Sequence, residues 1–284
     1  MPRNIRLPPT TSASQITCFT MCARKYACRY VLGVEPEFRS IQLILGSAMH
    51  SAIGWWFEER LSGRTPEVVA AESVLAADLQ AGAAGVPVRW KTSTPESLEA
   101  EARKLLRVYL AEMGDLSVKS VEVPFQVDIV DPSTGELLPR PMKGYFDLVL
   151  EDGRVVELKT SSRGWNEHDL KRHLQVGAYS YARNALEGGP SKIEIHVLVK
   201  LKREPRLETF QIERGEQQDE WWTTAAAETE YAIAAGRFPP SPSHLCFECE
   251  YARTCLSGDL APASERRIIP LHARDREPEP LPAG

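Results

Sequence analysis

A stretch of alternating apolar and charged residues, KGYFDLVLEDGRVVELKTSSR at residues 143–163, constrains the fold more than any other part of the chain. From Phe146 to Leu150 an apolar residue recurs at every second position, which is the period of a β-strand. An Asp-Gly pair then follows between two apolar runs, and this is a strong signal for the turn of a β-hairpin. A second strand over residues 155–159 completes the predicted hairpin.

Two acids and a lysine interrupt these apolar strands. Asp147 lies on the first strand, and Glu157 and Lys159 lie two residues apart on the second, so those two share one face. Burying such charges is costly unless they pair or bind a metal. Two carboxylates can hold Mg²⁺ or Mn²⁺ for phosphodiester chemistry, and the lysine can orient the attacking water. The alternative is that the acids lie at the surface and Lys159 pairs with one of them.

The composition is that of a soluble globular protein, with 284 residues of which 43% are apolar and 26% charged. No apolar run approaches the ~20 residues that cross a bilayer, and the N-terminal MPRNIRLPPTTSAS has no apolar core of a secretory signal. We therefore expect a cytoplasmic protein without a membrane partner. The net charge of −5 argues against a general DNA-coating protein, but it is compatible with a nuclease, because a metal site needs acids.

The order of predicted elements is helices, then strands, a helix, and more strands. We expect helices at about 15–29, 41–62, 66–80, 95–113, 166–186 and 217–235, and strands at about 117–130, 143–150, 155–159, 193–201 and 207–212. Either Ser12 or Ser14 can cap the first helix. This order predicts an α/β fold with a mixed central sheet flanked by helices, a helical N-terminal region and a Cys-rich C-terminal loop.

The same pattern predicts one domain over residues 12–256. Its parts are a helical N-terminal part (12–114), a catalytic sheet core (115–236) and a Cys-rich loop (237–256). The polar, proline-rich ends at 1–11 and 265–284 are expected to be disordered.

The predicted hairpin also carries a family motif. GYFD at residues 144–147, followed by ELKTS at 157–161, resembles the PD-(D/E)XK nuclease superfamily in its RecB-like branch, which includes CRISPR-associated exonucleases. That branch commonly shows G-hydrophobic-hydrophobic-D, then a strand ending in (D/E)-hydrophobic-K-T. The upstream VEVPFQVDI resembles its Glu-led strand. The resemblance implies a restriction-endonuclease-like core and hydrolysis of phosphodiester bonds with Mg²⁺ or Mn²⁺.

A helix after the hairpin places Gln175 and Tyr179 four residues apart, so they share one face. Without the resemblance, they are a glutamine at the edge of the core and a packed tyrosine. In that position they resemble the Q-x3-Y helix of the RecB-like branch. The resemblance implies that they orient Lys159, the metal site or the DNA strand.

His50 lies in the middle of an apolar helix, where a histidine is usually a satisfied core residue. Gly46-x3-His50 resembles the upstream G-x-x-hydrophobic-H helix of the same branch. The resemblance implies that His50 is a metal ligand together with Asp147, Glu157 and the Leu158 carbonyl. Imidazole suits Mn²⁺ better than Mg²⁺.

The cysteines form a second constellation. Cys246, Cys249 and Cys255 lie close together in the C-terminal loop, and three thiolates lack one ligand for a tetrahedral site. Cys22 is the preferred fourth ligand. It begins CARKYACRYVLG, which resembles the C-P-R-(K/R)-aromatic helix of iron–sulfur members, with Ala23 in place of the usual proline. The resemblance implies a [4Fe–4S] cluster that joins the first helix to the C-terminal loop.

Other interpretations of the cysteines remain. Structural Zn²⁺ on the same four thiolates is the main competitor, because ligand identity alone does not separate zinc from an iron–sulfur cluster. Free thiols are a third interpretation, whereas disulfides are not expected in a reducing compartment. Cys18 is a weaker alternative to Cys22, Cys28 is expected to pack, and His244 is a further candidate ligand.

Basic and aromatic residues of the first helix are candidates for nucleic-acid contact. Arg24, Lys25 and Tyr26 can meet phosphates and bases, or they can form a solvated face with the aromatic ring packed inward. Lys171, Arg172 and His173, just ahead of Gln175, are also expected to face the substrate.

Together these features predict a metal-dependent DNA nuclease of the RecB-like type. We expect an exonuclease on single-stranded DNA ends in repair, recombination, or CRISPR- or phage-type processing, with a helicase or a CRISPR or repair protein as partner. The alternative is a non-catalytic DNA-binding or adaptor subunit that keeps the fold. The intact set of Asp147, Glu157 and Lys159 argues against this alternative.

Overall fold

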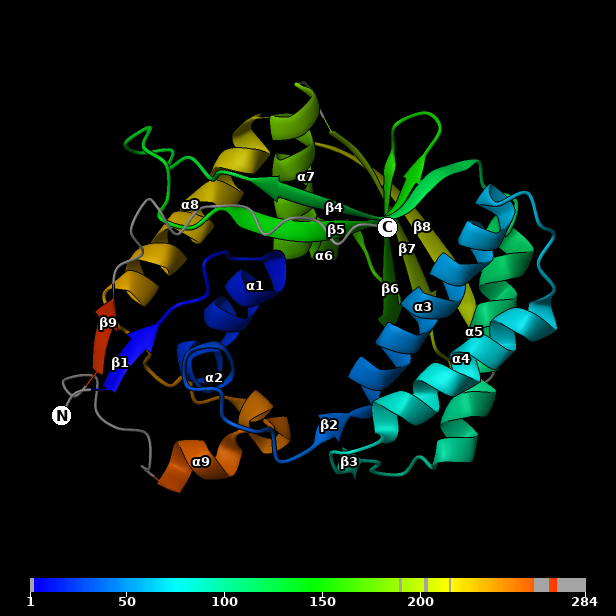
Figure 1. Cartoon of the computed structure of the whole chain (residues 1–284), viewed down its shortest axis with the longest axis horizontal. Helices are drawn as coiled ribbons and strands as arrows, with labels where there is room; N and C mark the ends of the chain where they lie inside the picture. Colours follow the sequence, from blue (N-terminus) through cyan, green and yellow to red (C-terminus); the bar gives the residue numbers. More distant parts are fainter. Residues whose placement is uncertain (1–2, 189–190, 202–203, 215, 258–265, 270–284) are drawn as a thin grey trace. The chain divides into compact units, whose positions relative to one another are not determined.

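A computed structural model of the chain describes residues 3–188, 191–201, 204–214, 216–257 and 266–269 (Figure 1). The chain divides into two compact units. The first comprises Met1–Glu35, Gln126–Lys143 and Glu220–Gly284, and the second comprises Pro36–Phe125 and Gly144–Asp219.

A five-stranded mixed sheet has the order β4-β5-β6-β7-β8. Its strands are β4 (Val118–Val127), β5 (Met142–Leu150), β6 (Val155–Ser161), β7 (Ser191–Val199) and β8 (Arg206–Arg214). β6 and β7 run parallel, whereas β5 with β6 and β7 with β8 are antiparallel. The predicted hairpin is β5–β6, and Gly153 takes the positive φ of 84° that its turn requires.

Three helices of the second unit lie together (Figure 1): α3 (Ile41–Leu61), α4 (Val68–Ala83) and α5 (Pro95–Met113). Two-residue strands, β2 (Arg39–Ser40) and β3 (Val88–Arg89), pair in parallel beside them. The helices bury their apolar side chains in one core with Leu148, Val156 and Leu158 of the sheet. This core holds α3 against the strands that carry the predicted acids.

The helix predicted over residues 166–186 is two helices, α6 (Glu167–Lys171) and α7 (Leu174–Glu187). The helix is interrupted at Arg172 and His173, because a side chain takes up the last carbonyl groups of α6. Arg214 Nη2 donates to the carbonyl oxygens of Leu170 and Lys171, both at 3.0 Å. Helix ends need such partners for their unpaired carbonyls.

α7 packs on the sheet through aromatic rings. Tyr179 meets Phe146 edge-on at 5.5 Å between ring centroids and Phe125 at 5.7 Å. The mixed sheet is therefore flanked by helices, as predicted.

The helix predicted over residues 15–29 is also broken. It forms α1 (Ala13–Met21), α2 (Ala23–Tyr26) and a short π-helix, η1 (Ala27–Val31), with Cys22 extended between α1 and α2 at φ −162° and ψ 108°. Beyond Cys22, the Arg24 N–H donates to the Pro239 carbonyl at 3.2 Å, so a tertiary hydrogen bond holds this turn of the chain. Ser12, and not Ser14, caps α1 by accepting the N–H of Gln15.

The C-terminal part of the described chain contains α8 (Glu216–Ala234), the 3₁₀-helix η2 (His244–Glu248) and α9 (Ala252–Ser257). A small apolar core joins α1 and α2 to the end of α8 and the segment after it, through Tyr26, Ile233 and Phe238. A buried ion pair, Arg140 with Glu230, lies in the same unit.

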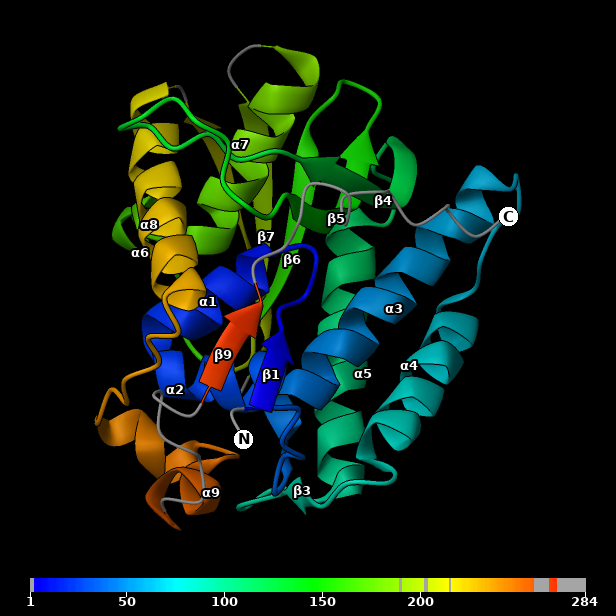
Figure 2. The same ribbon diagram turned by 60° about the vertical axis from the view of Figure 1, so that its left-hand side comes forward.

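The ends of the chain differ in part from the predicted tails. β1 (Arg3–Arg6) pairs in parallel with β9 (Arg266–Ile269), as Figure 2 shows, and the N–H of Thr11 donates to the Pro141 carbonyl. These segments are ordered because their backbone groups pair with each other. The rest of the predicted C-terminal tail, 265 and 270–284, lies outside the described residues. None of the described helices is long and apolar enough to cross a membrane.

Candidate functional site

Asp147 lies where the two strands of the hairpin separate. The β5–β6 register pairs Leu148 with Val156. Beyond this pair, the carboxylate of Asp147 replaces a main-chain carbonyl as the acceptor for a backbone N–H of β6. Asp147 Oδ2 accepts the backbone N–H of Leu158 at 2.7 Å. This hydrogen bond fixes the Asp147 carboxylate beside β6, at Leu158.

His50 reaches the same acid from α3. Its Nδ1 lies 3.2 Å from Asp147 Oδ1. α3 comes close to β6 at Gly46, where an added Cβ would lie 3.6 Å from Thr160 Oγ1. Burial lowers the pKa of His50, but the hydrogen bond and charge of Asp147 outweigh it, so the pKa lies above its ordinary value. Conversely, burial raises the pKa of Asp147, and its contacts with His50 and Leu158 bring that pKa below its ordinary value.

Glu157, Lys159 and Gln175 form a closed hydrogen-bonded set on β6 and α7. Lys159 Nζ donates to Glu157 Oε1 and, at 2.8 Å, to Gln175 Oε1. Gln175 Nε2 donates to Glu157 Oε1 at 2.6 Å and to the Tyr179 hydroxyl at 3.1 Å. The glutamine thus contacts both charged side chains, and Tyr179 sets the orientation of its amide.

The second oxygen of Glu157 has no hydrogen-bond partner in the part of the chain that the structure describes. Glu157 is 1% exposed, and its Oε2 is buried without a hydrogen bond. Burial raises the pKa of this carboxyl to about 7, although the neighbouring Lys159 ammonium opposes the rise. A buried carboxylate oxygen without a partner is costly, so it is a place where a cation would be stabilised.

Each of the two predicted acidic ligands contacts one basic side chain. His50 and Asp147 form one contact and Glu157 and Lys159 another, with the Leu158 N–H donating to Asp147. Across the described ranges, no three His, Cys, Asp or Glu side chains converge closely enough to hold a metal ion. Each acid therefore already contacts a basic side chain in this arrangement.

The predicted DNA-contacting residues differ in accessibility. Lys171 and Arg172 are exposed, and Lys171 lies 3.5 Å from Glu167 one turn earlier. Tyr26, in contrast, is fully buried, and it stacks on Phe238 at 6.1 Å. The prediction of a nucleic-acid contact by Tyr26 is therefore wrong, because its ring packs inward.

The two basic neighbours of Tyr26 are partly buried. Lys25 pairs with Glu250 at 2.8 Å, and the Nε of Arg24 is buried without a partner among the described residues. Lys25 therefore already has an acidic partner within its own unit.

The four predicted cluster cysteines belong to the first unit, and all six cysteines are free thiols. The segment around Cys22 contacts the C-terminal loop directly. The Arg24 N–H donates to the Pro239 carbonyl, and the Lys25–Glu250 pair lies beside Cys249 in sequence. Two segments more than 200 residues apart are therefore held together next to these thiols.

The thiols influence one another electrostatically. Burial raises the pKa of Cys249 and of Cys255, and the charge of Cys22 contributes to both shifts. Burial also raises the pKa of Cys28 to about 11, with further contributions from Cys255 and Cys249. Cys28 is buried as predicted, but its closeness to the other thiols was missed, since nothing in its spacing distinguishes it from a core residue.

Comparisons with known proteins agree with this geometry. The model of the PD-(D/E)XK nuclease superfamily matches residues 10–256, and the chain therefore belongs to this superfamily. A crystal structure from Eubacterium rectale, named "Putative exonuclease", is 14% identical with a TM-score of 0.53, and the alignment covers 87% of this chain and 88% of that chain. At this identity the likeness shows the shared α/β fold.

A second crystal structure, of a protein named SSO0001, is 16% identical with a TM-score of 0.37, over 81% of this chain and 88% of that chain. The search of curated proteins finds no match.

Proposed function

We propose that the chain is a metal-dependent DNA nuclease of the RecB-like branch that acts as an exonuclease on single-stranded ends. The observation that carries the proposal is the unpartnered, buried Oε2 of Glu157 beside Asp147 and Lys159. Superfamily membership supports the nuclease activity. The exonuclease assignment is supported by the RecB-like motifs and by the name of the Eubacterium rectale structure.

The chemistry of the donor set suits a divalent cation, although its acids contact basic side chains in this structure. His50, Asp147, Glu157 and the Leu158 carbonyl would hold it, because carboxylate and carbonyl oxygens suit Mg²⁺ and imidazole suits Mn²⁺. The unsatisfied Glu157 Oε2 supports this assignment. When bound, such a cation polarises the scissile phosphate and lowers the pKa of water. The two ion pairs of the site would have to part to admit it.

Lys159 then positions the attacking water. In the structure its ammonium group is held between Glu157 Oε1 and Gln175 Oε1. A fixed ammonium at this place also stabilises the negative charge that grows on the phosphate. Gln175 is a positioning residue, because its amide acts through the lysine and the glutamate and is itself held by Tyr179.

We also propose that Cys22, Cys246, Cys249 and Cys255 hold a [4Fe–4S] cluster, with Zn²⁺ as the competing occupant. The contact between their two segments supports a shared site, because the Arg24 N–H donates to the Pro239 carbonyl and Lys25 pairs with Glu250. Iron, sulfide and zinc analysis of anaerobically purified protein tests this proposal. A cluster also gives an absorbance shoulder near ~400 nm that is absent in Cys22→Ser.

End-labelled DNA tests the nuclease proposal. Single and double strands labelled at the 5′ or 3′ end are incubated with Mg²⁺ or Mn²⁺ and wild type, Glu157→Gln or Glu151→Gln. Glu151 is an exposed acid at the turn of the same hairpin, so its variant is the matched control. We expect wild type and Glu151→Gln to cleave and Glu157→Gln to be inactive. Equal inactivity of all three proteins would favour the non-catalytic adaptor.

Metal binding is measured separately by thermal melting. A cation at 100 times its dissociation constant stabilises the folded protein by about 2.7 kcal/mol. We expect Mn²⁺ to raise the melting temperature of wild type and of Glu151→Gln, and to leave that of Glu157→Gln unchanged.

A further inference from the structure

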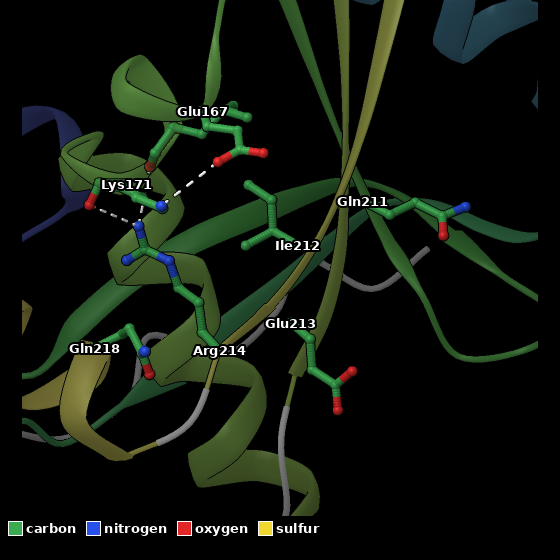
Figure 3. Close-up of a pocket in the computed structure, with 8 residues that line it drawn as sticks. Glu167, Lys171, Gln211, Ile212, Glu213, Arg214 and Gln218 are labelled. Atoms are coloured by element: carbon green, nitrogen blue, oxygen red, sulfur yellow. Dashed lines mark hydrogen bonds and ion pairs between the residues drawn. The ribbon is translucent and has the colours of Figure 1, made fainter.

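A cavity beside α6 has a volume of about 460 Å³ and is lined by the residues drawn in Figure 3. Its acids and bases balance, and Lys171 leans toward Glu167. Arg214, which is 4% exposed, does not offer its Nη2 to the cavity, because that nitrogen holds the carbonyl oxygens of Leu170 and Lys171 (Figure 3). The buried arginine therefore fixes the break between α6 and α7, and with it the place of His173.

At this break His173 pairs with a second aromatic ring. The centroids of Trp165 and His173 are 5.0 Å apart, with 34° between the ring planes. Trp165 is anchored twice more: its backbone N–H donates to Glu208 Oε2 at 2.8 Å, and its Nε1 donates to Ser161 Oγ at 3.3 Å. Both rings are partly exposed. The pair is thus a rigid aromatic surface that solvent reaches.

The pair lies next to the catalytic lysine. Glu157, Lys159 and Ser161 follow each other at two-residue spacing on β6, so they share one face, and Ser161 lies roughly 7 Å beyond Lys159. Trp165 is bonded to Ser161. His173 directly precedes α7, whose Gln175 accepts from Lys159. Both rings therefore lie at the end of the line of side chains that runs from Glu157 through Lys159 to Ser161.

His173 is an uncharged ring at neutral pH. Burial, together with the charges of Lys159 and Arg214, lowers its pKa to about 4, although Asp169 opposes this shift. Its Nδ1 is buried without a partner in the described part of the chain. The imidazole therefore adds no positive charge beside Lys159, and its contribution to this surface is a flat aromatic face.

We propose that Trp165 and His173 form a stacking shelf for a nucleobase of a single-stranded substrate, one nucleotide from the phosphate held at Lys159. Stacking on aromatic side chains accepts every base and requires an unpaired one, so it selects single strands without reading sequence. A base inside a duplex is already stacked and paired. This inference rests on the proposed nuclease function and specifies its substrate.

Binding without cleavage tests the shelf. A fluorescent oligothymidylate is titrated with wild type and variants in Ca²⁺, and anisotropy gives the dissociation constant. We expect Trp165→Leu and His173→Leu to weaken binding by about 10-fold or more, which is the scale of one lost stacking contact. Trp165→Phe and His173→Phe keep an aromatic face and should bind almost as wild type. Trp221→Leu, at an exposed tryptophan of α8, is the control.

Abasic oligonucleotides separate stacking from a structural role. Removing the base at successive positions should reveal one position where wild type loses affinity and Trp165→Leu loses none. Thermal melting of each variant checks folding. The shelf is overturned if Trp165→Leu and His173→Leu bind intact and abasic strands as wild type does, or if wild type does not bind single strands. A wild type that binds but does not cleave with Mn²⁺ would overturn the nuclease proposal and leave the binding result to decide the shelf.

Discussion

Asp147 Oδ2 accepts the backbone N–H of Leu158 at 2.7 Å, so a side-chain carboxylate completes the ladder where β5 leaves β6. The same carboxyl group meets His50 through its other oxygen. One acid thus links three segments of the second unit: α3, β5 and β6. Its hydrogen bond to the backbone also fixes the strand that carries Glu157 and Lys159.

This relationship predicts different outcomes for two substitutions of Asp147. Asp147→Asn keeps an oxygen that can accept the Leu158 N–H but removes the charge, so we expect a folded protein whose cleavage falls on the order of 100-fold or more. Asp147→Ala also removes the hydrogen bond and leaves His50 without its partner, so it should lower stability as well. Cleavage assays and urea unfolding measure the two effects. A cleaving Asp147→Asn would contradict a catalytic role.

Gln175→Ala should lower kcat on the order of 10-fold to 100-fold with little change in KM. The substitution removes the acceptor of Lys159 without removing the lysine, and small misplacements of a catalytic group have effects of this size. Tyr179→Phe keeps its ring on Phe146 and should have a smaller effect. Gln211→Ala, at an exposed position of β8, is the control. An unchanged kcat in Gln175→Ala would contradict the proposed role of Gln175 in positioning Lys159.

His173 predicts a specific dependence of stability on pH. Its pKa in the folded protein is about 4, below its ordinary value of 6.5. Between pH 4 and pH 6.5, the imidazole is therefore protonated in the unfolded chain and neutral in the folded chain. The contribution of His173 to the unfolding free energy is therefore complete above pH 6.5. It falls by roughly 3 kcal/mol as the pH decreases toward 4.

The matched variant isolates this contribution. In urea unfolding, the stability difference between wild type and His173→Phe should shift against wild type as the pH falls through this range. A difference that stays constant from neutral pH to pH 4 would show that His173 titrates normally in the folded protein.

The ion pair of Arg140 and Glu230 predicts a large effect on stability. Their side chains are 1% and 2% exposed and share two hydrogen bonds of 2.7 Å. Arg140→Ala leaves a buried carboxylate unpaired and should cost roughly 3–5 kcal/mol of unfolding free energy, whereas Arg140→Met with Glu230→Leu should recover most of it. Arg60→Ala, at an exposed pair with Asp115, should cost less than about 1 kcal/mol. Equal losses in the two arginine variants would contradict this account.

Periodicity and turn chemistry predicted most of the secondary structure. The Asp-Gly turn located the β5–β6 hairpin, and α5 occupies the predicted residues 95–113, because its capping Thr94 and its apolar face are local features. Motif order supplied the residues of the proposed catalytic set, and the structure brings Asp147 to His50 and Glu157 to Lys159. Local patterns suffice where each residue's conformation depends on its sequence neighbours.

The breaks at Cys22 and His173 depend on distant partners. The Arg24 N–H donates a hydrogen bond to the Pro239 carbonyl, and the Arg214 side chain donates to the last carbonyl groups of α6. Hydrogen bonds between remote segments therefore override helical periodicity at both sites. The inward packing of Tyr26 also depends on a distant residue, because its ring stacks on Phe238.

Periodicity and motif order along the chain therefore determined most of the strands and helices and singled out the acids and the lysine. Tertiary contacts decided which oxygen of Glu157 stays unpaired and which ring stands against Trp165. The physical reason is that burial and hydrogen-bond partners are properties of the packed chain, and the chemistry of a charged group depends on both.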